Sequence, residues 1–198
     1  MTLTPFVRHL GKCAALARAN VDTDQIIPKQ FLKRVERTGF GSALFHDWRL
    51  RPDGTQNTEF ELNQAEAVGA TILIAGANFG CGSSREHAVW ALAEYGFRAI
   101  LAPSFADIFS ANCCQNGVAP VRLSGDQIEE LVRRCRAGRG GYRLTVDLEA
   151  QRVTDDAGFA AAFTMEPYRR EMLLRGLDEI GRTLLEETRI TAFERTRT

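Results

Sequence analysis

The sequence predicts an α/β fold in which helices flank a mixed sheet, followed by a helical C-terminal segment. Short apolar runs rich in β-branched residues alternate with helical patterns through the centre of the chain. Extra strand patterns follow toward the end, which favours a mixed sheet over a purely parallel, doubly wound one. We therefore predict a single domain over residues 1–198, with a helical extension over about 166–198.

The central elements have the clearest patterns. Continuous apolar runs predict buried strands over 70–75, 98–102 and 118–123. Helical patterns follow each strand, over 83–95 with a stop at Gly96, over 104–114 and over 126–136. Alternating residues predict strands over 144–148 and 152–154, and the region from residue 166 is helical with interruptions near Gly176 and Gly181. The polar cluster 20–25 predicts a loop or short turn.

Composition restricts the class of function. The chain has 25 basic and 25 acidic side chains, so its formal net charge is zero and no broad attraction to nucleic acid or anionic membranes is expected. With 198 residues, 44% of them hydrophobic, it can bury a sizeable core. The longest apolar stretches, near 72–75 and 99–102, are too short to span a bilayer, and residues 1–5 do not resemble a signal peptide. We therefore expect a cytoplasmic protein.

The cysteines do not predict a disulfide framework or a metal site. Their number is odd and their spacing irregular, and no pair has the two-residue gap that is usual in zinc and iron–sulfur sites. Only three histidines accompany them. The sequence therefore predicts that this chain alone binds no cofactor. The cysteines are Cys13, Cys81, Cys113, Cys114 and Cys135.

A glycine-rich segment between the first two central elements carries the chemistry. Ser83 followed by Glu86 predicts a capping box at the start of a helix. The unpaired N–H groups and the dipole of such a helix start favour an anion, and Arg85 adds a planar guanidinium suited to a carboxylate. Gly80 and Gly82 would let a substrate approach the backbone closely. The segment predicts an anion site with a serine hydroxyl beside it.

Three common enzyme motifs do not fit this segment. A nucleophile elbow would need glycine where Glu86 stands, and a dinucleotide fingerprint would need glycine where Arg85 stands. A P-loop would need a lysine after the glycines, and the segment has none. The alternative interpretation, in which Ser83 only caps a helix and the glycines only turn the chain, stays open from these residues alone.

Three segments resemble a known family. Residues 20–29, 80–88 and 104–109 are similar to the swivelling domain of the aconitase superfamily, and within it to the small-subunit family of 3-isopropylmalate dehydratases. Residues 31–34 and 37–41 resemble the longer bacterial form. The resemblance covers nearly the whole chain and implies the aconitase-type swivelling β/β/α domain.

The resemblance also implies a reaction and a partner. The reaction is the reversible conversion of 2-isopropylmalate to 3-isopropylmalate by dehydration and rehydration through 2-isopropylmaleate, a step of leucine biosynthesis. A [4Fe–4S] cluster held by cysteines of a separate large subunit would bind the departing hydroxyl. Because removal of hydroxide near neutral pH needs a Lewis acid, this partner agrees with the absence of a cysteine metal motif here.

The family pattern implies roles for four residues of the site. Ser83 matches the catalytic base that takes the proton next to a carboxylate, and the helix start and Arg85 would stabilise its anionic form. Ser84 and Arg85 match ligands of the substrate carboxylates. Asp24 matches an aspartate that orients the site.

The loop over 29–37 is the predicted selector of substrate. Phe31 and Leu32 would contact the isopropyl group, and Lys33 or Arg34 would reach a carboxylate. The alternative is a solvated basic loop without contact to substrate.

Other residues near the motif have simpler interpretations. We expect His87 to pack or donate a hydrogen bond, Cys81 to be a small structural thiol, and Trp90 to belong to the core.

Two other functions stay open. The first alternative is the small subunit of a related hydro-lyase, of homoaconitase or methylmalate/citraconate type, because a third carboxylate would favour a cation from the loop, such as Lys33 or Arg34. The chain would also fit a non-catalytic anion-binding module.

Overall fold

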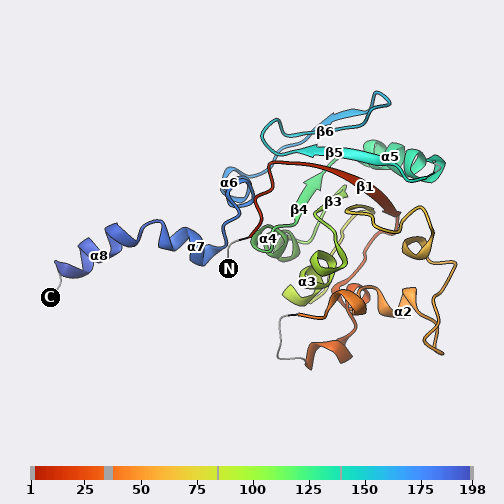
Figure 1. Ribbon diagram of the computed structural model, residues 1–198, viewed down its shortest axis with the longest axis horizontal. Coiled ribbons are helices and arrows are strands. Elements are labelled where there is room, and N and C mark those ends of the chain that lie inside the picture. Colours follow the sequence, from red (N-terminus) through yellow and green to blue (C-terminus); the bar gives the residue numbers. More distant parts are fainter. Residues whose placement is uncertain (1–2, 34–37, 84, 139, 197–198) are drawn as a thin grey trace.

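The structure is a computed structural model that describes residues 3–33, 38–83, 85–138 and 140–196. Its framework is a seven-stranded mixed sheet in the order β4-β3-β2-β1-β5-β6-β7 (Figure 1). Strands β1 to β4 are parallel, and β5, β6 and β7 continue the sheet in antiparallel fashion from β1. The predicted mixed sheet is confirmed. Its strands are β1 (Arg8–Leu16), β2 (Ile72–Ala75), β3 (Ala99–Ala102), β4 (Ala119–Arg122), β5 (Arg143–Asp147), β6 (Arg152–Thr154) and β7 (Ala160–Ala162).

Helices cover both faces of this sheet (Figure 1). None of those in the described ranges is long and apolar enough to cross a membrane. The α-helices are α1 (Thr23–Ile26), α2 (His46–Arg49), α3 (Glu86–Tyr95), α4 (Asp107–Gln115), α5 (Gly125–Ala137), α6 (Pro167–Arg175), α7 (Glu179–Leu184) and α8 (Glu187–Arg195). Short 3₁₀ turns are η1 (Lys29–Lys33), η2 (Gly41–Ala43) and η3 (Glu61–Asn63).

The sequence patterns did not reveal β1, although it lies at the centre of the sheet. It pairs in parallel with β2, where Cys13 faces Ile72, and antiparallel with β5, where Leu10 faces Thr145. Small residues and a glycine replace the β-branched residues that mark the other central strands. A Cβ on Gly11 would lie 2.3 Å from Thr71 Oγ1, so the strand tolerates no larger residue there. The alanine strand β7 was missed for the same reason.

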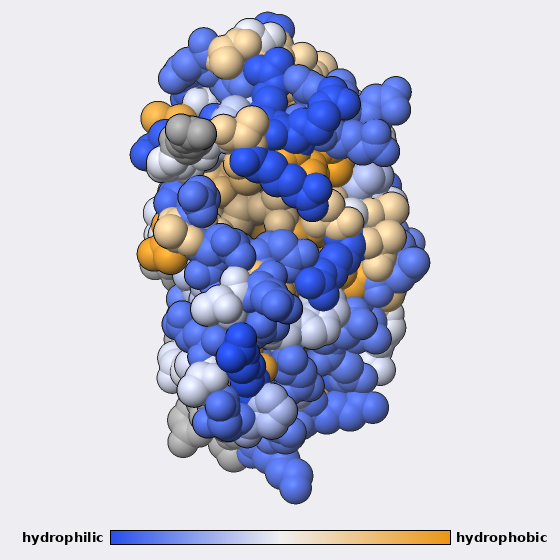
Figure 2. All heavy atoms as spheres, turned by 90° about the vertical axis from the view of Figure 1, so that its right-hand side faces the viewer, coloured by the Kyte–Doolittle hydropathy of each residue, from blue (hydrophilic) through white to orange (hydrophobic). Residues whose placement is uncertain are grey.

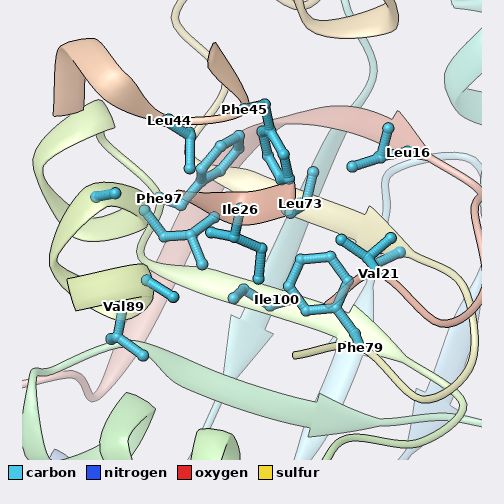
Figure 3. Packing of buried hydrophobic residues seen from close by; sticks show 14 of the residues in the cluster. Leu16, Val21, Ile26, Leu44, Phe45, Leu73, Phe79, Val89, Phe97 and Ile100 are labelled. Atoms are coloured by element: carbon cyan, nitrogen blue, oxygen red, sulfur yellow. The ribbon is translucent and has the colours of Figure 1, made fainter. Parts of the chain in front are cut away.

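Alternate residues of the parallel strands enter two separate cores. Leu73 points into a cluster with residues of α1, α3 and the long connection from β1 to β2. Figure 3 shows this cluster, with Ile26 of α1 lying among Leu73, Phe97 and Ile100. Ile72 points to the other face, toward α5 and α6. Both faces are therefore covered, as expected for continuous apolar strands.

The C-terminal helical region agrees with the prediction in part. The interruption at Gly176 is confirmed, because this residue ends α6 with a φ of +64°. The interruption expected at Gly181 is wrong, since Gly181 lies inside α7 and its N–H bonds to Asp178 Oδ1. Met172 and Leu173 bury one side of α6, whereas α7 and α8 project away from the sheet (Figure 1).

Candidate active site

Three connections meet at the carboxyl ends of the parallel strands, which is the usual place for a ligand site in an α/β sheet. They follow β1, β2 and β3. The N–H of Gly80 donates to Val21 O at 2.8 Å, and the N–H of Thr23 donates to Cys81 O at 2.9 Å. On the other side, the N–H of Phe79 donates to Ser104 O at 3.1 Å. The glycine-rich segment is thus held between its two neighbours like a short additional strand.

Two asparagines hold the beginning of this segment. Asn20 and Asn78 both adopt positive φ angles, of 55° and 56°, and the Asn78 side-chain amide donates to Asn20 Oδ1 at 2.9 Å. The Asn78 backbone N–H donates to Ser104 Oγ at 2.8 Å. Asparagine tolerates this left-handed conformation better than most residues. The pair therefore ties the connection after β1 to the one after β2.

A pocket of about 280 Å³ opens where these connections meet. The Ser83 residue is exposed there, while the Arg85 side chain is only 15% exposed. The first turn of α4 forms the opposite wall, and Ile108, which is 57% exposed, stands at its rim. The residues that line the pocket are Thr23, Gly80, Gly82, Ser83, Arg85, Ala106, Asp107, Ile108 and Phe109.

The predicted capping box at Ser83 is wrong. Helix α3 begins at Glu86, its N-cap residue is Arg85, and no side chain caps it. Thr23 Oγ1 donates to the main-chain oxygen of Ser83 at 2.8 Å, which holds Ser83 in the connection before the helix. The Glu86 carboxylate accepts instead from Asn116 Nδ2 at 2.9 Å. Ser83 therefore does not cap α3, and it lines the pocket instead.

An ion pair ties Arg85 to Asp24. Asp24 lies in α1, a helical turn that forms where the sequence predicted a loop or short turn; Asp22 and Gln25 form a capping box around it. Lys29 Nζ lies 3.3 Å from the second Asp24 oxygen. Asp24 therefore fixes the planar guanidinium from one side and adds no net negative charge to the site, because two cations face it.

The part of the predicted selector loop that the structure describes, residues 29–33, does not line this pocket. Leu32 is half-buried against the first core cluster, and Lys33 is exposed; neither lines the pocket. Phe31 packs on His46, with ring centroids 4.9 Å apart. Arg34 lies outside the described residues, as does Ser84. The substrate contacts proposed for these residues stay predictions.

Five pocket residues were not predicted from the sequence: Thr23, Ala106, Asp107, Ile108 and Phe109. The segment 104–109 carries part of the family resemblance, but its sequence pattern predicts no role for its side chains. An aliphatic residue at the start of a helix, next to the anion motif in space, became recognisable only from the fold.

Comparison with known proteins identifies the family. The Aconitase C-terminal domain family matches residues 3–126, and LeuD_N matches residues 129–167. The 3-isopropylmalate dehydratase small subunit of Geobacillus kaustophilus is 60% identical over 193 residues, which cover 98% of this chain and 97% of that protein. The chain belongs to the family of 3-isopropylmalate dehydratase small subunits. A small-subunit relative from Rhodopirellula baltica is also 60% identical, over 97% of this chain and 98% of its own length.

A solved structure agrees with the fold of this small-subunit family. The crystal structure of 3-isopropylmalate dehydratase (leuD) from Methanocaldococcus jannaschii superimposes with a TM-score of 0.66 at 26% identity. The match covers 95% of this chain and 99% of that one. The predicted family and the aconitase-type fold are therefore confirmed. The name small subunit also implies a larger partner chain.

His87 and Cys81 are close in sequence to the pocket residues, but neither lines the pocket. The His87 ring packs edge-on against the Phe40 ring, with centroids 5.3 Å apart. The centroids of the His87 and Trp90 rings are 4.6 Å apart. The expectation that His87 packs is confirmed. Cys81 contributes its backbone oxygen to the contact with Thr23, and its thiol is half-buried.

The described His, Cys, Asp and Glu side chains do not form a ligand set for an iron–sulfur cluster. Within the described ranges, no three side chains of His, Cys, Asp and Glu are grouped as metal ligands. Cys13, Cys113 and Cys114 are buried. Burial raises the pKa of Cys114 to about 12, which disfavours the thiolate form that binds metal.

A second pocket lies on another face. The side shown in Figure 2 is mostly hydrophilic, with apolar side chains gathered in a hollow. A pocket of about 320 Å³ is lined there by residues of β1, α5 and the connection before β2, among them Cys13, Glu61, Ala67 and Cys135. None of the predicted site residues that the structure describes lines this pocket, so we assign the site to the pocket at Ser83.

Proposed function

We propose that this chain acts as the small subunit of a 3-isopropylmalate dehydratase and supplies half of its active site. The observation that carries the proposal is the convergence of an exposed Ser83 and a fixed Arg85 in one pocket at the strand ends. Relatives of 60% identity, which bear the name of this subunit, support the same substrate. In the reaction, 2-isopropylmalate loses water to give 2-isopropylmaleate, which takes up water again to give 3-isopropylmalate.

Ser83 is the proposed base in this half-site. Its hydroxyl would take the proton from the carbon next to a substrate carboxylate. A serine alkoxide is unfavourable in water, so it needs nearby positive charge. Arg85 lines the pocket and would supply that charge, and the N–H groups at the start of α3 would add to it.

Arg85 and Ser84 are the proposed ligands of a substrate carboxylate. Asp24 holds the Arg85 guanidinium from one side, which orients its remaining N–H groups before substrate arrives. The large subunit would hold the [4Fe–4S] cluster, which supplies the Lewis acid that a departing hydroxyl needs.

The test is a reconstituted pair of this chain with a candidate large subunit, assayed by the absorbance of the unsaturated intermediate. Ser83→Ala should lower kcat by a factor of about 10²–10⁴, the usual loss for a general base, while pair formation stays intact. Ser42→Ala, an exposed serine in η2, is the matched control and should keep full activity. Full activity of Ser83→Ala would instead support a non-catalytic anion-binding module.

A related hydro-lyase is the second candidate, because Lys29 places an exposed ammonium 3.3 Å from Asp24, beside the site. A substrate with a third carboxylate would use such a cation. Assaying the pair with isopropylmalate, homoaconitate and methylmalate separates the candidates. Preference for either of the last two substrates would reject the isopropylmalate assignment.

A further inference from the structure

The last two helices of the chain expose aliphatic side chains. In α7, Ile180 and Leu184 are 71% and 59% exposed and stand one helical turn apart on the same face. Leu185 is 51% exposed, and Ile190 in α8 is 41% exposed. Neither helix contains a buried residue. Residues 178–196, called the C-terminal arm below, extend away from the sheet in Figure 1.

Such an arm is not expected to be stable without a partner surface. Helices of six and nine residues are marginal in water, because tertiary packing supplies most helical stability. An aliphatic stripe rimmed by charged residues is also the pattern of a helix that docks through one face. The arm therefore has the properties of an interaction element.

The base of the arm is connected to the candidate active site through α4. Gln115, at the end of α4, donates to Glu179 Oε1 at 2.7 Å. The first turn of the same helix lines the pocket, with Ile108 at its rim. A helix of this length spans about 13 Å. A protein that covers the pocket at one end of α4 is consequently close to the arm at the other end.

The surface between pocket and arm is open and partly apolar. A groove of about 480 Å³ lies between α4 and α6, lined by Ser110 and Arg169 among others. On α6, Tyr168 is 40% exposed, and the guanidinium of Arg182 in the arm stacks 4.1 Å from its ring centroid. Asp107 lines both this groove and the pocket at Ser83, so an open surface continues from the site toward the base of the arm.

We propose that the C-terminal arm docks on the large subunit, in continuity with the rim of the active site. The proposal rests on the proposed function, which requires the large subunit to close the pocket at Ser83. Relatives named small subunits align over 193 of the 198 residues, so the alignment includes nearly all of the arm. A second copy of this chain is the poorer occupant, because the exposed apolar side chains of the arm, Phe193 included, fall short of the about 800 Å² per partner that a standard interface buries. A large subunit that closes the pocket would bury the surface around Ile108 in addition to the arm.

The experiment measures binding separately from turnover. The double variant Ile180→Glu/Leu184→Glu is titrated with the large subunit by calorimetry, alongside the unchanged chain. Burying two charges in place of two aliphatic groups should raise the Kd at least 100-fold. Val68→Glu is the matched control: it alters a side chain that is 64% exposed, in the connection before β2, and should leave the Kd unchanged. Because neither altered arm residue is buried, the thermal unfolding of the isolated double variant should match that of the unchanged chain.

Each outcome decides the proposal. An unchanged Kd for the double variant, or an equal loss with Val68→Glu, would overturn arm docking. Self-association of the isolated chain that the double variant abolishes would assign the arm to a second copy instead. Ile190→Glu repeats the test on α8 if the double variant does not fold. Failure of the proposed function would give a different result: the unchanged chain would still bind the large subunit, but the pair would show no turnover of isopropylmalate.

Discussion

The hydroxyl of Thr23 donates a hydrogen bond to the main-chain oxygen of Ser83, over 2.8 Å and across 60 positions of sequence. Thr23 is only 2% exposed, and its backbone N–H donates to Cys81 O as well. One residue of α1 therefore holds both ends of the three-residue segment that ends at the proposed base. The next residue, Asp24, holds Arg85.

This contact predicts that Thr23 positions Ser83. Thr23→Val keeps the shape of the side chain but removes the donor, which should cost about 1–2 kcal/mol of stability. We expect kcat of the reconstituted pair to fall about 10–100-fold with little change in KM, because the base moves while carboxylate binding persists. Thr23→Ser retains the hydroxyl and should recover most of kcat; equal losses in both variants would contradict a positioning role.

Replacement of Arg85 by lysine should separate charge from geometry. Lysine can still pair with Asp24, so the fold should persist, but it lacks the planar fork that binds a carboxylate through two N–H groups. We expect KM for isopropylmalate to rise at least about tenfold, which corresponds to a lost charge-assisted hydrogen bond. Steady-state kinetics of the pair measure this, with Arg133→Lys on the exposed face of α5 as the control. An unchanged KM would remove Arg85 from the substrate contacts.

Gly80 should tolerate no side chain. Its φ is +75°, and a Cβ would lie 2.1 Å from Phe109 Cγ in the pocket wall. Gly80→Ala should lower the free energy of unfolding by about 2–5 kcal/mol, from backbone strain and overpacking together. Gly158 has a similar φ of +87° but open space around it, so Gly158→Ala should cost only the strain, about 1–2 kcal/mol. Urea unfolding of both variants checks the difference, and equal costs would show that crowding by Phe109 is unimportant.

The carboxylate of Asp155 predicts a pH dependence of stability. Burial by itself would raise the pKa of Asp155, but hydrogen bonds from Tyr142, Phe159, Ala157 and Arg134 outweigh it and lower this pKa. Because the pKa is lower in the folded state, the ionised carboxylate stabilises the protein at pH values above the unfolded-state pKa of about 3.9. This stabilisation is lost as the pH falls through the folded-state pKa.

Asp155→Asn should therefore cost about 2–3 kcal/mol at pH 7, since several donors lose a charged acceptor. The difference from the unchanged chain should shrink below about pH 4. Thermal unfolding at pH 7 and pH 3 measures it, and the exposed neighbour Asp156→Asn serves as the control. A difference that is constant with pH would show that the ionised carboxylate is not the stabilising form.

Sequence patterns predicted most of the central elements and failed at particular residues. The strand runs before Gly76 and after Gly96 were recognisable because continuous apolar residues mark buried strands. The capping box at Ser83 was wrong because a local pattern takes no account of Thr23, which lies far away in sequence and holds this segment in place. The helical turn α1 was missed because four residues are too few to show periodicity.

The sequence by itself determined the alternation of strands and helices, the glycine-rich anion motif and the family, because these depend on residue types close together in the chain. The tertiary structure decided that Asp24 pairs with Arg85, that Ile108 and not Leu32 lines the pocket, and that a strand without β-branched residues occupies the centre of the sheet. These outcomes depend on strand order and on packing between distant segments. Hydrophobic periodicity within one segment carries no information about either.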